Sequence, residues 1–199
     1  MPARLPTEER QAEIVAAALR LAGECSPAQI TTADIATAVG VTQGALFKHF
    51  LSKDAIWLAA MGWVHASLLR ALQEAADAAA TPLAALEAVF HTHVGFVVAH
   101  PGVPRVIFHE LQQPADSPSK REVRMLLQDY RQLLLRLLGQ AVAQGQLRGD
   151  LDAEAAATGF VGLIQGLVMQ SMLAGQPAAM RQLAGRVLML YLRGVGAGA

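Results

Sequence analysis

The chain has 199 residues, of which 53% are hydrophobic and only 16% are charged. This composition excludes a largely disordered protein, because disordered segments are rich in charge and poor in apolar residues. Sixteen Lys+Arg balance sixteen Asp+Glu, which excludes a polycation of the histone type, and the single cysteine, Cys25, excludes a disulfide framework.

Strong helix formers dominate the chain, and no run of alternating β-branched residues predicts a strand. Helices are expected at about 7–23, 32–39, 43–50, 53–80, 82–99, 104–112, 120–144, 153–174 and 178–193, separated by Thr, Pro and Gly signals. We therefore predict an all-α fold of about nine helices. A small N-terminal three-helix domain (1–54) is expected before a larger helical bundle (55–199).

The most apolar stretch tests whether the chain enters a membrane. Residues 155–174 carry no charge over twenty positions, a length that could just span a bilayer. Gln165, Gln170 and Ser171 dilute this stretch, and no Lys/Arg cluster or aromatic belt flanks it. We interpret it as a helix buried on most of its faces. Because the charged start of the chain also lacks an apolar signal core, we expect a cytoplasmic protein without a membrane partner.

The stretch from Thr31 to Lys53 has the pattern of a helix-turn-helix, at about residues 31–50. Apolar residues occupy the inner faces of two short helices, and Gly40 stands at the sharp turn between them, where positive φ is needed. This geometry would present the outer face of the second helix to a DNA major groove, with its N-terminal residues at base edges.

The outer residues of this second helix suit contact with DNA. Thr42 and Gln43 are short polar readers, and glutamine can bond adenine in a bidentate way. Gly44 lets the helix approach the duplex closely. The residues expected to reach phosphates are Lys48, His49 and Lys53, together with Thr31 and Thr32 at a helix N-terminus.

The order TT-x-x-I-A-x-x-x-GV-T-x-G-A-L-F-x-HF-x-SK resembles the DNA-binding domain of the TetR family of bacterial transcriptional repressors, over about residues 7–58. The rest of the chain is similar to the family only in architecture. The resemblance implies a homodimer with a DNA-binding domain (1–54) and a ligand-binding and dimerisation domain (55–199). It also implies release from an operator, expected to be a pseudo-palindrome, when a small-molecule effector binds.

Carried over residue by residue, the resemblance places seven side chains at DNA: Thr31, Thr42, Gln43, Phe47, Lys48, His49 and Lys53. Phe47 departs from the family, which commonly has tyrosine there with a hydroxyl that reaches a phosphate. We therefore expect Phe47 to pack against a sugar or a thymine methyl, or to turn inward. Residues 1–54 hold five Lys/Arg and six Asp/Glu, so the non-specific electrostatic attraction to DNA should be modest.

The predicted helix at 153–174 is apolar nearly all round, so we expect one side to face its own domain and the other a partner subunit. The helix at 178–193 repeats this pattern, and two such helices from each subunit would form a four-helix interface. The predicted interface residues are Phe160, Leu163, Ile164, Leu167, Val187 and Tyr191. The alternative is that these side chains form the core of a monomer.

A small-molecule site is expected between the predicted helices from 53 to 144, because apolar walls with a few polar groups suit such a ligand. The candidate lining residues are His65, Leu68, Phe90, His93, Val97, Phe108, Met125 and Tyr130. Ordinary core packing is the alternative for most of them.

Other classes of function receive less support from the sequence. His91, His93, His100 and His109 raise the question of a metal, but no carboxylate or cysteine accompanies them at ligand spacing, so we expect neither metal nor cofactor. No phosphate-cradling loop, nucleophile elbow or His-Glu-x-x-His motif indicates an enzyme. A helical interaction module or a ligand-binding protein without DNA binding remains the alternative function.

Overall fold

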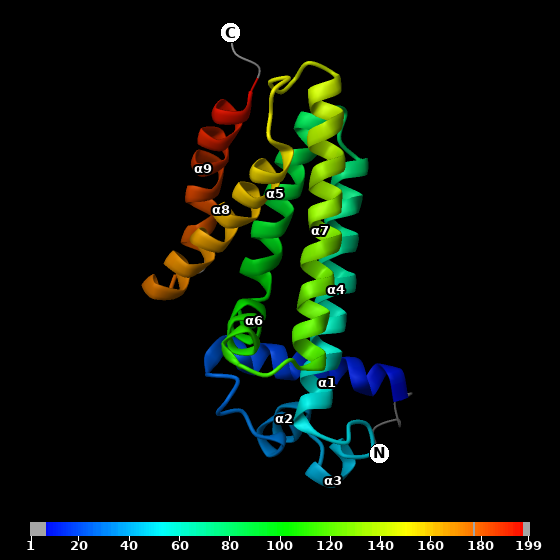
Figure 1. Cartoon of the computed structure of the whole chain (residues 1–199). Helices are drawn as coiled ribbons and strands as arrows, with labels where there is room; N and C mark the ends of the chain where they lie inside the picture. Colours follow the sequence, from blue (N-terminus) through cyan, green and yellow to red (C-terminus); the bar gives the residue numbers. More distant parts are fainter. Residues whose placement is uncertain (1–6, 177, 197–199) are drawn as a thin grey trace. The chain divides into compact units, whose positions relative to one another are not determined.

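The computed structural model describes residues 7–176 and 178–196, and over these ranges the chain is all-α, with nine helices and no strand (Figure 1). The helices are α1 (Thr7–Glu24), α2 (Thr32–Val39), α3 (Gln43–Leu46), α4 (Lys53–Asp77), α5 (Pro82–Ala99), α6 (Gly102–Gln112), α7 (Pro118–Ala143), α8 (Ala153–Ala174) and α9 (Ala179–Val195). The predicted fold class is therefore confirmed.

The chain divides into two compact units, which do not follow the boundary expected at residue 54. The first contains residues 7–66 and 100–125, and the second contains the remaining described residues, 67–99 and from 126 onwards. The division falls inside α4 and α7, so each of these helices contributes to both units. The functional division at residue 54 stays a prediction, whereas α6 belongs with α1–α3 in the folded chain.

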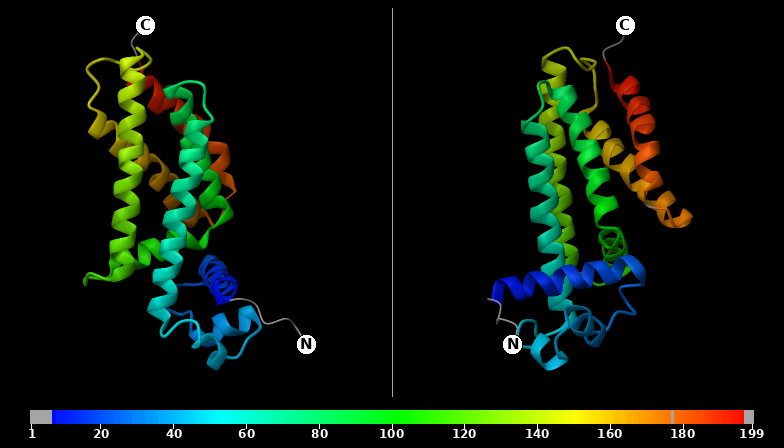
Figure 2. Two further views of the ribbon diagram at one scale, coloured as in Figure 1. Left: turned by 90° about the vertical axis from the view of Figure 1, so that its right-hand side faces the viewer. Right: turned by 180° about the vertical axis from the view of Figure 1, so that it is seen from behind.

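In the first unit, α6 packs closely on α1 (Figure 2). A side chain at Gly102 would collide with the carbonyl oxygen of Leu19, so only glycine permits this approach. Val103 and Val106 of α6 are buried together with Ile14 of α1. Removal of this apolar surface from water stabilises the unit and fixes α1 as the platform for the two short helices that follow.

In the second unit, α8 and α9 pack against each other and against α5 (Figure 2). Phe160 of α8 is completely buried between aromatic rings from two other helices. Its centroid lies 5.3 Å from Phe90 of α5 and 5.6 Å from Tyr191 of α9, both edge to face. The Tyr191 hydroxyl donates to the carbonyl oxygen of Ala156 at 2.8 Å, which satisfies its polar end inside this apolar layer.

Some helix ends differ from the prediction for local reasons. Regular helix α3 stops at Leu46 instead of continuing to Phe50, and a tighter turn carries the chain through residues 47–49. Helix α7 begins at Pro118, two residues before the predicted start at residue 120. The Ser117 hydroxyl accepts a hydrogen bond from the backbone N–H of Lys120 at 2.9 Å, and proline is well suited to a first helical turn.

Helices α4, α5 and α8 are each long and apolar enough to cross a membrane, judged by length and composition alone. In the folded chain, α8 buries one stripe of side chains against its own unit, including Phe160, Ile164 and Leu167. Its opposite face is exposed in a single chain, so burial of that face by a partner subunit stays a prediction.

Candidate DNA-binding site

Local hydrogen bonds define both helices of the predicted helix-turn-helix. Thr31 caps α2 in a reciprocal capping box, where its side chain accepts from the Asp34 N–H at 3.1 Å and its own N–H donates to the Asp34 carboxylate at 2.8 Å. Gly40 ends α2 with a φ of 77°, the positive value predicted from the sequence. Thr42 then caps α3 by accepting from the Ala45 N–H at 3.2 Å.

The first residues of α3 present their side chains outward. Thr42, Gln43 and Gly44 are exposed, while Leu46 is completely buried beneath them. The Gln43 amide donates to the Thr32 hydroxyl at 2.7 Å, which holds the predicted base-reading side chain in one orientation. A Cβ at Gly44 would meet nothing within 4 Å in the protein, so the fold itself does not require glycine at this position.

The turn after α3 continues the exposed surface. Phe47 is 41% exposed, so it does not turn fully into the core, and its packing against a sugar or a thymine methyl stays a prediction. Lys48 beside it is exposed, whereas Phe50 is buried and anchors the turn. An apolar ring and a cation therefore lie next to the outward residues of α3.

His49 is held partly inside the unit. Its carbonyl oxygen accepts from the Gln11 side chain at 3.2 Å, and its Nδ1 is buried without a hydrogen-bond partner among the described residues. Because Nδ1 is buried, a contact of this side chain with DNA would have to use Nε2. That nitrogen is the one with which His49 can donate to a phosphate.

Two of the predicted phosphate ligands already have partners within the chain. The ammonium group of Lys53 donates to the carbonyl oxygens of Ile30 at 3.0 Å and Ala28 at 3.4 Å, so it braces the segment before α2. The Thr31 hydroxyl donates to the Asp34 carboxylate at 2.7 Å, and these bonds from Thr31 lower the pKa of Asp34. A phosphate at the start of α2 would therefore meet a carboxylate.

The structure separates the eight candidate effector-site residues between the two units. His65, Phe108 and Met125 belong to the first unit, and the other five, Leu68, Phe90, His93, Val97 and Tyr130, belong to the second. His65 forms a part-buried pair with Glu122 at 2.7 Å, and Met125 is 46% exposed.

Two of the five residues in the second unit are in direct contact. Nδ1 of His93 lies 3.2 Å from the hydroxyl of Tyr130, and their ring centroids are 5.3 Å apart. Burial lowers the pKa of His93 to about 4 and raises that of Tyr130, so both groups are neutral at physiological pH. His93 keeps some accessible surface, and Tyr130 is 1% exposed.

Three of the six predicted dimer-interface residues require a correction. Phe160, Ile164 and Leu167 are 0%, 1% and 4% exposed in a single chain, so they form its core and present no surface to a partner. Tyr191 is bonded to α8 within the chain, and Leu163 and Val187 are half-buried. The sequence could not show which side of an all-apolar helix faces inward.

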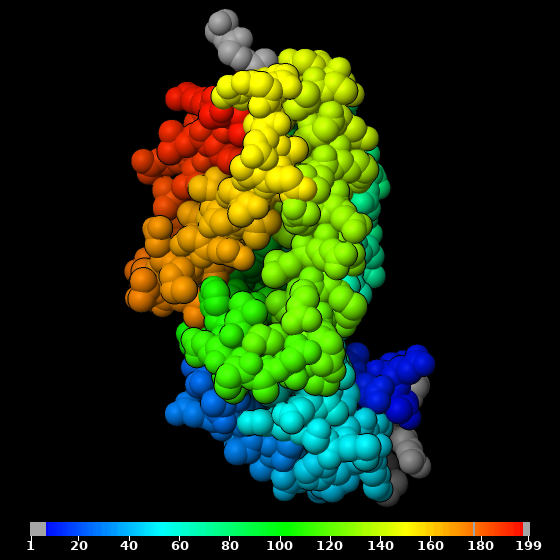
Figure 3. All heavy atoms as spheres, in the orientation of Figure 1, coloured from blue at the N-terminus to red at the C-terminus, as the bar shows by residue number. Residues whose placement is uncertain are grey.

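The apolar residues that α8 and α9 leave exposed are different ones. Met169 and Leu173 of α8 are 46% and 82% exposed, and Met189 and Leu190 of α9 are 54% and 70% exposed. The two helices form a continuous surface in the space-filling view, where α8 is orange and α9 is red (Figure 3). We call these four residues the α8–α9 apolar face. Their spacing of four along α8 places Met169 and Leu173 on one face, opposite the buried stripe.

The histidines lie in separate environments. His93 contacts Tyr130, while His100 stacks edge to face on Trp63 at 5.1 Å and His91 on Phe90 at 6.1 Å. Within the described ranges, no group of three or more His, Cys, Asp or Glu side chains is arranged to hold a metal ion.

Comparison with known proteins places these features in a family. Residues 14–60 match the family model described as bacterial regulatory proteins, tetR family, and residues 113–186 match the tetracyclin repressor-like C-terminal domain. The chain is 29% identical to the HTH-type transcriptional regulator TtgR of Pseudomonas putida over 173 residues, 83% of this chain and 81% of TtgR. It is 25% identical to the HTH-type transcriptional repressor KstR2 of Mycobacterium tuberculosis, over 73% of this chain and 72% of KstR2.

A solved structure extends the similarity to the whole fold. The transcriptional regulator FadR from Bacillus subtilis, crystallised in complex with stearoyl-CoA, superposes with a TM-score of 0.80. The match covers 92% of this chain and 98% of FadR at 22% sequence identity, so it shows a shared fold.

Proposed function

Since the chain belongs to the TetR family of bacterial transcriptional regulators, we propose that it is a homodimeric, cytoplasmic repressor that binds a pseudo-palindromic operator and leaves it when a small molecule binds. The observation that carries this proposal is the outward face of α3. There, two polar side chains, a glycine and an adjacent cation are exposed on a turn fixed by two threonine caps.

The side chains on this face divide into two roles. Gln43, oriented by Thr32, reads a base edge in the major groove, and Thr42 contributes beside it. Lys48 and the Nε2 group of His49 contact phosphates, and Phe47 packs against a sugar or a thymine methyl. Lys53 acts first as a brace for the segment before α2, so its contribution to DNA affinity is indirect.

The α8–α9 apolar face is the surface we propose for the homodimer. Large apolar side chains exposed to water are costly, and a group of them on one pair of helices typically marks an interface. Two copies of α8 and α9 would cover these side chains in a four-helix arrangement, which replaces the predicted set centred on Phe160. A two-fold dimer presents two copies of α3 to two half-sites.

The interior of the second unit is the proposed place of the effector, with His93 and Tyr130 as its polar groups. The helix that joins effector and operator is α4, which starts after the helix-turn-helix at Lys53 and has its later residues in the second unit. A ligand that shifts α4 changes the spacing of the two recognition helices. By linkage, operator binding weakens effector binding by the same factor.

Selection of binding sites from random duplex DNA by the purified protein tests this function. We expect enrichment of a pseudo-palindrome whose half-site centres are about 34–36 Å apart, or a multiple of that distance. Selection with Gln43→Ala should enrich a motif relaxed at one position per half-site. No enrichment at low salt by protein that is folded, and that has been refolded to remove any bound effector, would favour the alternative of a helical interaction module.

A further inference from the structure

A hollow of about 710 Å³ lies within the first unit, and none of its lining residues belongs to α3. The first turns of α4, the end of α6 and the segment leading into α7 form its walls. Sites for small organic molecules typically measure about 300–1,000 Å³. The hollow therefore has the size of a ligand site, and it contains none of the eight residues predicted to bind the effector.

One wall of this hollow carries a buried carboxylate. Glu110 is 9% exposed, and it is the only charged side chain that is buried in the described part of the chain. The Ser117 hydroxyl donates to its Oε2 at 2.8 Å, but Glu110 forms no ion pair with any described residue. A buried carboxylate without a counter-charge is expensive, because it has lost its hydration and gained little in return.

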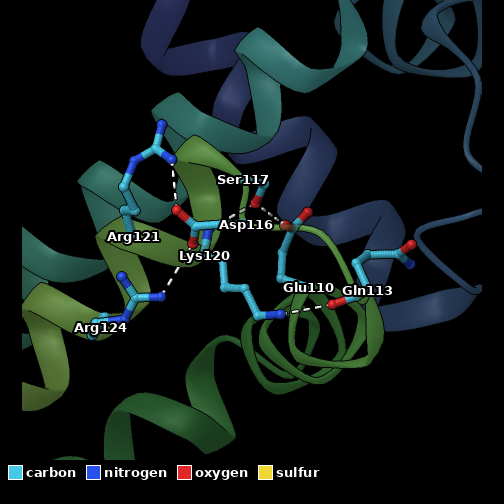
Figure 4. Close-up of polar contacts among 7 residues, drawn as sticks. All are labelled: Glu110, Gln113, Asp116, Ser117, Lys120, Arg121 and Arg124. Atoms are coloured by element: carbon cyan, nitrogen blue, oxygen red, sulfur yellow. Dashed lines mark hydrogen bonds and ion pairs between the residues drawn. The ribbon is translucent and has the colours of Figure 1, made fainter.

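The cationic side chains near this carboxylate bind other groups (Figure 4). Arg121 and Arg124 both bind Asp116, at 2.8 and 3.1 Å, and the Lys120 ammonium donates to the carbonyl oxygen of Gln113 at 2.6 Å. Lys53, which lines the hollow, donates to the backbone before α2. The fold therefore leaves Glu110 without a cationic partner in a place where an external cation can reach it.

The other walls complete a site for an amphipathic molecule. Trp57 and Leu58 of α4 provide apolar surface, and Leu58 is 37% exposed. Asp54 lines the hollow as a second carboxylate, and Ser119, 5% exposed, adds a buried hydroxyl. We propose that this hollow binds an organic cation, with a protonated amine beside Glu110 and an apolar body against Leu58 and Trp57.

This site is separate from the effector site of the proposed function, and it lies in the unit that carries the helix-turn-helix. Lys53 connects the hollow to the helix-turn-helix, because it lines the hollow and also braces the segment before α2. Occupancy by a cation would therefore act on the DNA-binding unit directly. The proposal does not depend on an operator or on a ligand in the second unit, so it can fail while the proposed function stands.

Isothermal titration of the full-length protein with a matched pair of probes tests the proposal. The probes are 4-phenylbutylamine, which is protonated at neutral pH, and 4-phenylbutan-1-ol, which has a similar shape and no charge. We expect the unaltered protein to bind the amine at least about tenfold more tightly than the alcohol. Glu110→Gln should remove this preference by weakening amine binding about tenfold, with alcohol binding unchanged.

Asp116→Asn is the control, because it removes the same charge nearby from a carboxylate that does not line the hollow. It should leave amine affinity within about twofold. Equal affinity for the two probes in the unaltered protein would overturn the proposal, and so would no saturable binding of the amine. The probe comparison needs no variant, so the test holds even if Glu110→Gln proves unstable. An equal loss of amine affinity in Glu110→Gln and in Asp116→Asn would contradict the role of Glu110.

Discussion

The helix-turn-helix of α2 and α3 and the hairpin of α8 and α9 obtain their functional surfaces in opposite ways. In the first, backbone and polar side chains are fixed by hydrogen bonds between residues close in sequence, such as the capping box of Thr31 and Asp34. In the second, two helices rich in apolar residues divide into a buried and an exposed face mainly by packing. A surface defined by hydrogen bonds between neighbouring residues can be predicted from the sequence. A surface defined by packing between helices can be identified only once the fold is known.

The largest expected effect concerns the α8–α9 apolar face. Leu190→Glu places a charge on this face in both subunits, so the dimer would have to bury two unpaired carboxylates. At about 2 kcal/mol each, the dimer dissociation constant should rise about a thousandfold, measured by sedimentation equilibrium. Leu111→Glu, at a 48% exposed leucine of α6, is the matched control. A dimer unaffected by Leu190→Glu would place the interface elsewhere.

Inside the second unit, the buried His93 makes stability depend on pH. Its pKa of about 4 in the folded state lies below the unfolded value of 6.5, so the unfolded chain binds more protons between these values. Stability is therefore complete above pH 6.5 and falls by up to about 3 kcal/mol as the pH drops to 4. Urea unfolding at a series of pH values should show this loss in the free energy of unfolding for the unaltered protein, and His93→Gln should not show it. Parallel curves for the two would contradict a buried neutral His93.

At the helix-turn-helix, Gln43→Ala should change specificity more than overall affinity. One good base contact is worth about 1–3 kcal/mol of discrimination, so preference for the correct base at one position per half-site should fall correspondingly. Competition titrations with operator duplexes altered at that position measure the change. Preference at the other positions of the operator should stay unchanged, which serves as the control. Retained discrimination in Gln43→Ala would mean that another residue reads that base.

The smallest expected effect comes from a substitution that adds a contact with DNA which this chain lacks. Phe47 is 41% exposed, so the hydroxyl of a tyrosine there would point outward and could bond a phosphate. Phe47→Tyr should add about 0.5 kcal/mol in each subunit, so operator affinity should rise by about 1 kcal/mol, roughly fivefold, in anisotropy titrations. Phe47→Leu should not raise it. Unchanged affinity in Phe47→Tyr would show that this side chain does not approach the backbone of the DNA.

Much of the fold and of the DNA-binding face was predictable because its signals are local. The turn at Gly40 and the caps at Thr31 and Thr42 each involve residues within four positions of one another. Such signals favour particular backbone dihedrals through contacts that can be read within a few residues of sequence. The outward position of Gln43 on a short helix with a buried Leu46 follows from the same reasoning.

The parts that sequence reasoning missed depend on contacts between distant residues. The bond from Lys53 to the carbonyl oxygen of Ile30 and the close approach of Gly102 to Leu19 have no local signature. The face of α8 that packs inward is selected by α5 and α9, which is why Phe160 was predicted at the wrong surface. The hollow beside Glu110 likewise exists only after α4 and α6 come together.

The central claim is that the outward face of α3 and the turn after it bind DNA, and Lys48→Ala tests it most directly. Operator and scrambled duplexes would be titrated with both proteins over a series of salt concentrations. The account predicts that affinity falls equally on both duplexes. It also predicts that the slope of log K against log salt decreases by about 1.8, since each subunit loses one phosphate contact worth about 0.9. An unchanged affinity and slope would contradict this placement of the DNA-binding face.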